Sequence, residues 1–91
     1  MKSNYEITLQ GKVQGVGFRY FAQKKAAEFN ITGYVRNMHG RVVLIVAEGE
    51  NSDVDTFLDH MRIGPTMARV TQVSVSKSPY TGSFPAFEVR Y

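Results

Sequence analysis

The chain has no cysteine and no tryptophan, and it has only two histidines, His39 and His60. Without cysteine it cannot form a disulfide, a thiolate zinc site or an iron–sulfur cluster, and it has no thiol nucleophile. Two histidines also exclude a three-histidine zinc site. No stretch approaches the ~20 apolar residues of a membrane span, and the first residues lack the apolar core of a signal peptide. We therefore expect a cytoplasmic protein, and the lack of cysteine fits a reducing compartment.

A length of 91 residues leaves room for one domain, which we expect to span residues 1–91. This length excludes a six-stranded dinucleotide-binding fold, a (β/α)₈ barrel and a protein kinase. Eleven Lys and Arg against eight Asp and Glu give a formal net charge of +3. A positive charge favours anionic partners, such as nucleic acid, anionic lipid, or a small phosphate or carboxylate. The alternative is a mixed, slightly basic surface with no charged partner.

Two periodic patterns alternate along the chain and predict its secondary structure. Apolar residues at every second position of 5–9 indicate a half-buried strand, and apolar residues at helical spacing indicate a helix over 18–29. The same patterns predict strands at 33–38, 41–47, 70–75 and 87–91, and a second helix that begins at the N-cap Ser52 and ends at Gly64-Pro65. The continuous apolar run 42–46 predicts a central strand, and His39-Gly40 predicts a two-residue hairpin turn.

The resulting order is β-α-β-β-α-β with a short additional strand at the C-terminal end. This order is typical of the α+β class and of the ferredoxin-like, split βαβ arrangement, in which two helices cover one face of an antiparallel sheet. We expect Tyr20, Phe21, Phe29 and Phe57 to pack in the core or along the helix faces. Many unrelated functions use this fold, so the fold alone does not decide the function.

A glycine-rich turn, Gln14-Gly15-Val16-Gly17-Phe18-Arg19, lies between the first strand and the first helix. The first backbone N–H groups of a helix have no internal acceptor, and the helix dipole adds positive potential there. Glycines let the backbone approach an anion closely, and the guanidinium of Arg19 can donate to two phosphate oxygens at once. The turn therefore predicts a binding site for a phosphate-sized dianion.

Common glycine-rich phosphate motifs do not match this turn. The dinucleotide-binding signature lacks its third glycine, because Tyr20 stands there, and the Lys-Ser/Thr pair of a P-loop is absent. The aromatic residues after Gly17 are similar to a signature of RNA-recognition modules, which share the βαββαβ topology. In those modules the stacking aromatics belong on the third strand, and here the run 42–46 has none. We expect no nucleic-acid or membrane partner, and a non-catalytic module that binds RNA or protein is kept as an alternative.

Two motifs resemble the signatures of the acylphosphatase family. Gly11-Lys12-Val13-Gln14-Gly15-Val16-Gly17-Phe18-Arg19 closely resembles the first signature, and Gly33-Tyr34-Val35-Arg36-Asn37 resembles the opening of the second. The resemblance covers essentially the whole chain. It implies hydrolysis of acyl phosphates to a carboxylate and inorganic phosphate by direct attack of water, without metal, cofactor or covalent phosphoenzyme. We expect the chain to act as a monomer.

The resemblance also implies roles for individual residues. The phosphate-binding residues are expected to be Gly15, Val16, Gly17 and Phe18 through their backbone N–H groups, together with the side chain of Arg19. Asn37 is expected to orient the attacking water, and its side chain offers one acceptor and two donors for this role. An acyl phosphate has a good leaving group, so positioning and charge stabilisation can suffice without a tuned general base.

One segment departs from the family pattern. The pattern usually has two residues after the asparagine, then an acidic residue or asparagine, then glycine, whereas Met38-His39-Gly40 is one residue shorter. We interpret His39 as an exposed turn residue, Arg36 and Arg41 as solvated, and Tyr91 as a packing residue. An alternative within related chemistry is a domain that handles carbamoyl phosphate in a larger carbamoyltransferase.

Overall fold

The computed structural model describes all 91 residues and contains two helices and five strands. In chain order they are β1 Lys2–Lys12, α1 Phe18–Glu28, β2 Thr32–Met38, β3 Val42–Glu50, α2 Asn51–Ile63, β4 Arg69–Pro79 and β5 Phe87–Arg90. The order expected from the sequence is confirmed. The strands β1 and β4 are each longer than their apolar alternation indicates, because their exposed ends still pair with a neighbouring strand.

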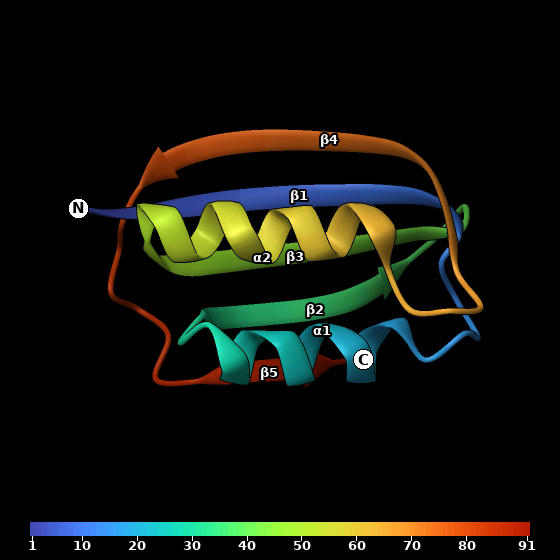
Figure 1. Cartoon of the computed structure of the whole chain (residues 1–91), viewed down its shortest axis with the longest axis horizontal. Coiled ribbons are helices and arrows are strands. Elements are labelled where there is room, and N and C mark those ends of the chain that lie inside the picture. The colour runs from blue at the N-terminus through green and yellow to red at the C-terminus, as the bar shows by residue number, and fades with distance from the viewer.

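The five strands form one sheet in the order β4-β1-β3-β2-β5, with β3 at its centre as the continuous apolar run predicted. Pairing is antiparallel except between β2 and β5, which are parallel, so the expectation of a purely antiparallel sheet is wrong for this last pair. The reason is the path of residues 80–86. They cross the end of the sheet at which β2 starts, so β5 begins there and runs in the same direction (Figure 1).

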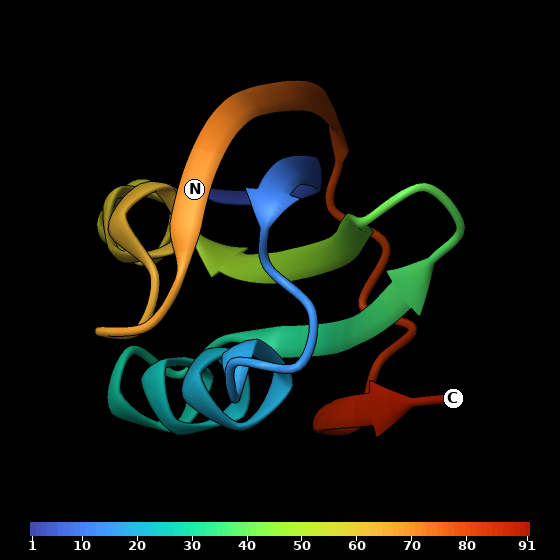
Figure 2. The same cartoon turned by 90° about the vertical axis from the view of Figure 1, so that its right-hand side faces the viewer.

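Both helices lie on one face of the sheet, as the view along its strands shows (Figure 2). Alternate residues of each strand point toward them, and 16 buried residues form a single core. Among these, the strands supply Ile7, Leu9, Val35 and Ile45, and the helices supply Phe18, Ala22, Val54, Phe57 and Met61. The expectation that Tyr20 packs is wrong, because its side chain is 71% exposed.

Two predicted turns differ in detail from the structure. Helix α2 begins at Asn51 with Glu50 as its N-cap, two residues before the expected cap position of Ser52. The Asn51 N–H donates to the carbonyl of Met1 (2.8 Å), so the N-terminus of the chain replaces a side-chain cap. In the β2–β3 hairpin, Met38 pairs with Val42, so the loop has three residues rather than two. Its positive φ angles fall on Gly40 (78°) and Arg41 (59°).

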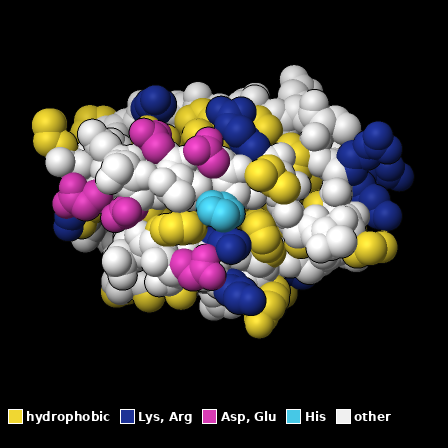
Figure 3. Space-filling model, viewed as in Figure 1, with side chains coloured by type: hydrophobic (Ala, Val, Ile, Leu, Met, Phe, Trp, Pro, Cys, Tyr) yellow, Lys and Arg dark blue, Asp and Glu magenta, His cyan; other side chains and the backbone are white.

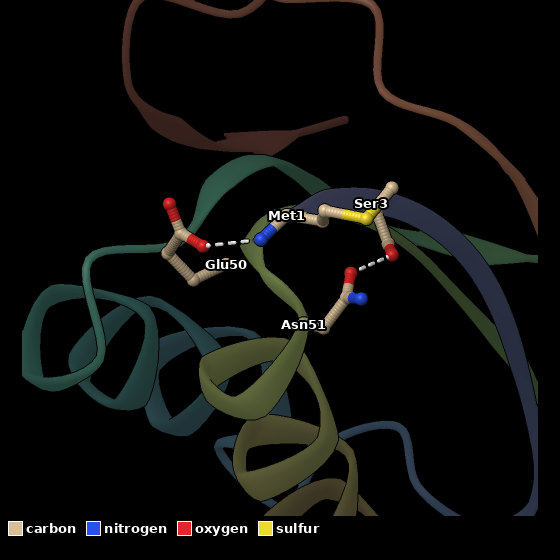
Figure 4. A network of polar contacts seen from close by, with 4 residues as sticks. All are labelled: Met1, Ser3, Glu50 and Asn51. Carbon is tan, nitrogen blue, oxygen red and sulfur yellow. Dashed lines mark hydrogen bonds and ion pairs between the residues drawn. The ribbon is translucent and has the colours of Figure 1, made fainter.

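The elements define two ends of the molecule. One end, which we call the site end, holds the end of β1, the starts of α1, β3 and β4, and the β2–β3 hairpin. The far end holds the N-terminus, where the Met1 ammonium pairs with Glu50 (3.2 Å) and Ser3 donates to the side chain of Asn51 (Figure 4). The far end is therefore fixed by polar contacts between residues distant in the sequence, and the site end is built around the glycine-rich turn.

The far end also contains the only buried charged side chain, Glu48. Its carboxylate accepts hydrogen bonds from the Asn4 amide, from the backbone N–H and hydroxyl of Thr81, and from the Gly82 N–H, at 2.7–3.1 Å. Burial alone would raise the pKa of Glu48, but these hydrogen bonds outweigh it and hold the pKa below its ordinary value. The buried carboxylate thereby fastens the segment that leads to β5.

Candidate active site

The turn between β1 and α1 has the backbone that its glycines predicted. Gly15 and Gly17 have φ angles of 72° and 78°, in the left-handed region that L side chains rarely adopt. A Cβ at either position would contact nothing within 4 Å, so conformation rather than crowding requires glycine here. The turn therefore faces open space at the site end, where a ligand has access to its backbone.

The backbone N–H groups of this turn are unused within the protein. Gly17 is the N-cap of α1 and supplies no side-chain cap, and the first hydrogen bond of the helix is donated by Phe21 to the Gly17 carbonyl (3.0 Å). The N–H groups of Gly15, Val16, Gly17 and Phe18 donate to no acceptor in the chain. They lie at the positive end of the helix dipole, and the first turn of α1 contains no acidic residue that would neutralise it.

Phe18 and Val16 anchor the turn to the hydrophobic core. Phe18 is only 2% exposed and contacts Phe21 edge-to-face, with ring centroids 5.9 Å apart. Val16 is partly buried against the core. The two apolar side chains point inward, and this orientation fixes the backbone of a turn whose polar groups face outward. The same residues that rigidify the turn thus leave its N–H groups free for a ligand.

Arg19 follows immediately in the first turn of α1 and is half-buried. Its guanidinium carbon lies 4.6 Å from the ring centroid of Tyr91, and the side chain forms no ion pair with a carboxylate. Tyr91 is 93% exposed, so it packs against Arg19 rather than in the core. A guanidinium stacked on an aromatic ring keeps all its N–H groups free to donate to an oxyanion.

Asn37 lies near the end of β2 and pairs across the sheet with Val43. Val43 is fully buried in the core beneath the helices, so Asn37 points to the same helix-covered face. Its side-chain oxygen Oδ1 is buried and has no hydrogen-bond partner in the protein. Such an atom is costly unless another molecule satisfies it, and a water is the smallest group that can.

Gln14 joins these two parts of the site, and its role was not foreseen from the sequence. Its side-chain amide donates to the carbonyls of Met38 (2.7 Å) and Val42 (2.9 Å), the two residues that close the β2–β3 hairpin. The glycine turn is thereby tied to the residue that follows Asn37. The sequence signal was a polar residue with two donors at the start of the turn, but its acceptors lie 24 and 28 residues away.

No group of three or more His, Asp or Glu side chains in the structure could hold a metal ion. His39 is an exposed residue of the hairpin loop, as expected, and His60 packs on Phe29 with ring centroids 5.2 Å apart. Neither helix is both long enough and apolar enough to cross a membrane. The glycine-rich turn and the strand end beside it present unused N–H groups, the guanidinium of Arg19 and the amide of Asn37.

Comparisons with known proteins identify the family of the chain. A model of the Acylphosphatase family matches residues 5–89. An acylphosphatase of Geotalea uraniireducens is 41% identical over 91 residues, an alignment that covers 100% of both chains. The crystal structure of acylphosphatase from Bacillus subtilis matches with a TM-score of 0.94 at 35% identity, covering 98% of this chain and 99% of that one. Full-length HypF, in its phosphate- and nucleotide-bound form, matches with a TM-score of 0.91 at 26% identity, covering 100% of this chain but 12% of HypF. The chain belongs to the acylphosphatase family and is an enzyme that hydrolyses acyl phosphates.

Proposed function

We propose that the phosphate of the substrate binds to the N–H groups of Gly15, Val16, Gly17 and Phe18 and to the guanidinium of Arg19. The observation that supports this most strongly is the set of unused N–H groups at the start of α1, directly beside a guanidinium without a carboxylate partner. Together they match a dianion in charge and in hydrogen-bonding geometry. We call these five residues the phosphate cradle.

In this proposal Asn37 holds the attacking water. Its buried Oδ1 accepts a hydrogen bond from the water, and Gln14 keeps the hairpin that bears Asn37 against the cradle turn. The water oxygen attacks phosphorus as the bond from phosphorus to the acyl oxygen breaks. The electron pair leaves with the carboxylate, and both protons of the water pass to the phosphate product, so the products are a carboxylate and dihydrogen phosphate.

Catalysis in this scheme rests on positioning and on charge stabilisation. The carboxylate is a good leaving group and needs no proton, and the cradle faces the charge on the phosphoryl oxygens throughout the displacement. No residue must titrate near neutral pH for the step to occur. We further propose that the reaction needs no metal ion, that the enzyme acts as a monomer, and that it works in the cytoplasm.

The decisive assay is phosphate release from acetyl phosphate, with carbamoyl phosphate as a second substrate that contains the same carboxyl–phosphate anhydride. The assay is run with excess chelator, with added Mg²⁺, and with a phosphate monoester in place of the anhydride. We expect equal rates with chelator and with Mg²⁺, and no release from the monoester. Activity that disappears with chelator and returns with Mg²⁺ would overturn the metal-free mechanism, and equal turnover of the monoester would overturn the proposed substrate selectivity.

A further inference from the structure

The acidic side chains of this protein lie away from its site end. On the face shown in Figure 3, the acidic side chains lie over the left and middle of the molecule, and the right-hand end, which is the site end, carries Lys and Arg but no acidic side chain. The elements agree: Glu48, Glu50 and Asp53 belong to the end of β3 and the start of α2 at the far end. A field of this form draws anions toward the site end.

A second feature at this end is a groove of about 490 Å³ beside the phosphate cradle. Gly11, Lys12, Val13, Gln14 and Arg41 line it. It has two cations and no carboxylate, and neither cation belongs to any of the three ion pairs of the structure. The groove is not the cradle, although Gln14 borders both. Lys12 lies three residues before Gly15, so their Cα atoms are at most about 11 Å apart.

The backbone just before Lys12 departs from regular strand geometry. The pairing of β1 with β4 shifts register between Gln10 and Gly11, and a Cβ on Gly11 would lie 2.1 Å from the Arg69 carbonyl oxygen. Beyond this irregularity, Lys12 pairs with Arg69 on β4. Like charges opposite each other on neighbouring strands destabilise a sheet. The two strands thus place two cations in register, and neither cation forms an ion pair with a carboxylate.

Arg41 reaches the groove from the other side. It is exposed, and its φ of 59° places a non-glycine residue in the left-handed region, directly after Gly40. Glycine or asparagine would take this conformation with less strain, and strained residues of this kind are concentrated at sites that hold ligands. The hairpin therefore presents a guanidinium at a position where the backbone alone would favour another residue.

From these observations we propose that the groove between Lys12 and Arg41 is a second oxyanion subsite, which binds a carboxylate or phosphate group next to the cradle. Two sources could supply this group: the acyl half of a substrate that carries its own negative charge, or a separate small anion bound together with the substrate. In both cases the groove makes binding or turnover depend on a second anionic group, which the cradle alone does not. The inference concerns the substrate class of the activity described above and rests on that activity.

The first arm of the test compares two substrates of equal chain length, glutaryl phosphate with a terminal carboxylate and pentanoyl phosphate without one. We expect the ratio of their kcat/KM values to favour glutaryl phosphate in the unmodified enzyme. The ratio should fall about threefold to fivefold in Lys12→Gln and in Arg41→Gly, the size expected for one exposed charge pair, and further in the double variant. Glycine suits the φ of residue 41, so Arg41→Gly removes the charge without straining the hairpin.

The second arm detects a separate anion. Inorganic phosphate is titrated into the protein while the backbone amide resonances of residues 11–14 and 41 are followed by NMR. A groove that binds free phosphate shifts these resonances with a midpoint of their own, and the shifts disappear in the double variant. Lys24→Gln, which removes an exposed cation from α1, is the matched control for net charge in both arms.

A change in the substrate ratio assigns the groove to the acyl group, and a separate phosphate midpoint assigns it to a free anion. The proposal is overturned if the double variant leaves both the ratio and the amide shifts unchanged, or if Lys24→Gln changes them equally. Hydrolysis of pentanoyl phosphate by the unmodified enzyme reports on the activity itself. Its absence would count against the proposed function, whereas an unchanged ratio counts only against the subsite.

Discussion

Replacing Asn37 with alanine removes the group that we assign to hold the attacking water and leaves the phosphate cradle in place. Because Asn37 Oδ1 has no partner in the protein, no donor of the protein loses its acceptor in the variant. We expect kcat to fall about 10²–10³-fold, which corresponds to the roughly 2.7–4 kcal/mol that the loss of one preorganised transition-state hydrogen bond costs. The affinity for inorganic phosphate should change little, because Arg19 and the N–H groups still bind it.

The same variant has a second readout, in stability. A buried polar atom without a partner costs about 1–3 kcal/mol, and alanine removes that atom. The free energy of unfolding of Asn37→Ala should therefore stay the same or rise while kcat falls. A residue that only supported the hairpin would show the opposite, with stability and activity decreasing together. A lower kcat with unchanged or higher stability therefore indicates that Asn37 orients the water, and a lower kcat with lower stability indicates a structural role.

The assay combines steady-state kinetics on acetyl phosphate, a phosphate titration and urea denaturation. Asn37→Asp should not restore kcat, because its negative charge faces a dianionic substrate. Gln23→Ala, which removes an exposed amide from α1, is the control and should behave like the unmodified enzyme. An unchanged kcat in Asn37→Ala would refute the assignment and require another group to orient the water. A clear loss of stability in Asn37→Ala, whatever its effect on kcat, would refute the stability argument.

Four further outcomes follow from the same structure. Arg19→Lys keeps the charge but loses the two parallel donors, so phosphate affinity should fall about 10-fold to 100-fold in a binding titration, with the melting temperature retained. Tyr91→Ala removes the ring on which Arg19 stacks, an interaction of about 0.5–1 kcal/mol, so KM should rise about twofold to fivefold while the metal-free character of the reaction stays the same. Gln14→Ala unties the turn from the hairpin, and kcat should fall while circular dichroism shows the fold intact. Glu48→Gln should lower stability at pH 7 by about 1–3 kcal/mol and leave kcat unchanged. Since the pKa of Glu48 is lowered by folding, its stabilisation is present above the ordinary glutamate pKa and is lost as the pH falls through the folded-state value, so the acid limb of the unfolding curve should be flatter in this variant.

The elements of the fold were predictable because their signals are local. Period-two alternation predicted β1, helical spacing predicted the buried stripe of α1, and the glycines of the turn predicted its positive φ angles. The exposure of Tyr20 was also implicit in the pattern, because a residue two positions after the buried Phe18 faces away from the core. The structure places the site residues named from the sequence in the glycine-rich turn, at the start of α1 and near the end of β2, and their catalytic roles remain predictions.

Other features depend on partners that are distant in the sequence. The direction of β5 follows from the path of residues 80–86 across the sheet, which no periodic pattern encodes. The role of Gln14 depends on two carbonyls of the hairpin, and the α2 N-terminus depends on the carbonyl of Met1. The pairing of Lys12 with Arg69 requires the register of β1 and β4, which are far apart along the chain. Such contacts follow from how the strands are arranged in space, and a single sequence does not specify that arrangement residue by residue.

The central claim is that water attacks phosphorus directly within the cradle, without a metal and without a covalent intermediate. The most direct measurement uses an acyl thiophosphate made chiral at phosphorus with oxygen isotopes and hydrolysed in isotopically labelled water with excess chelator present. A single in-line displacement inverts the configuration at phosphorus, so the account predicts a thiophosphate product of inverted configuration. Retention of configuration would require two successive displacements through a phosphorylated side chain, and that result would contradict the roles assigned to Asn37 and its water.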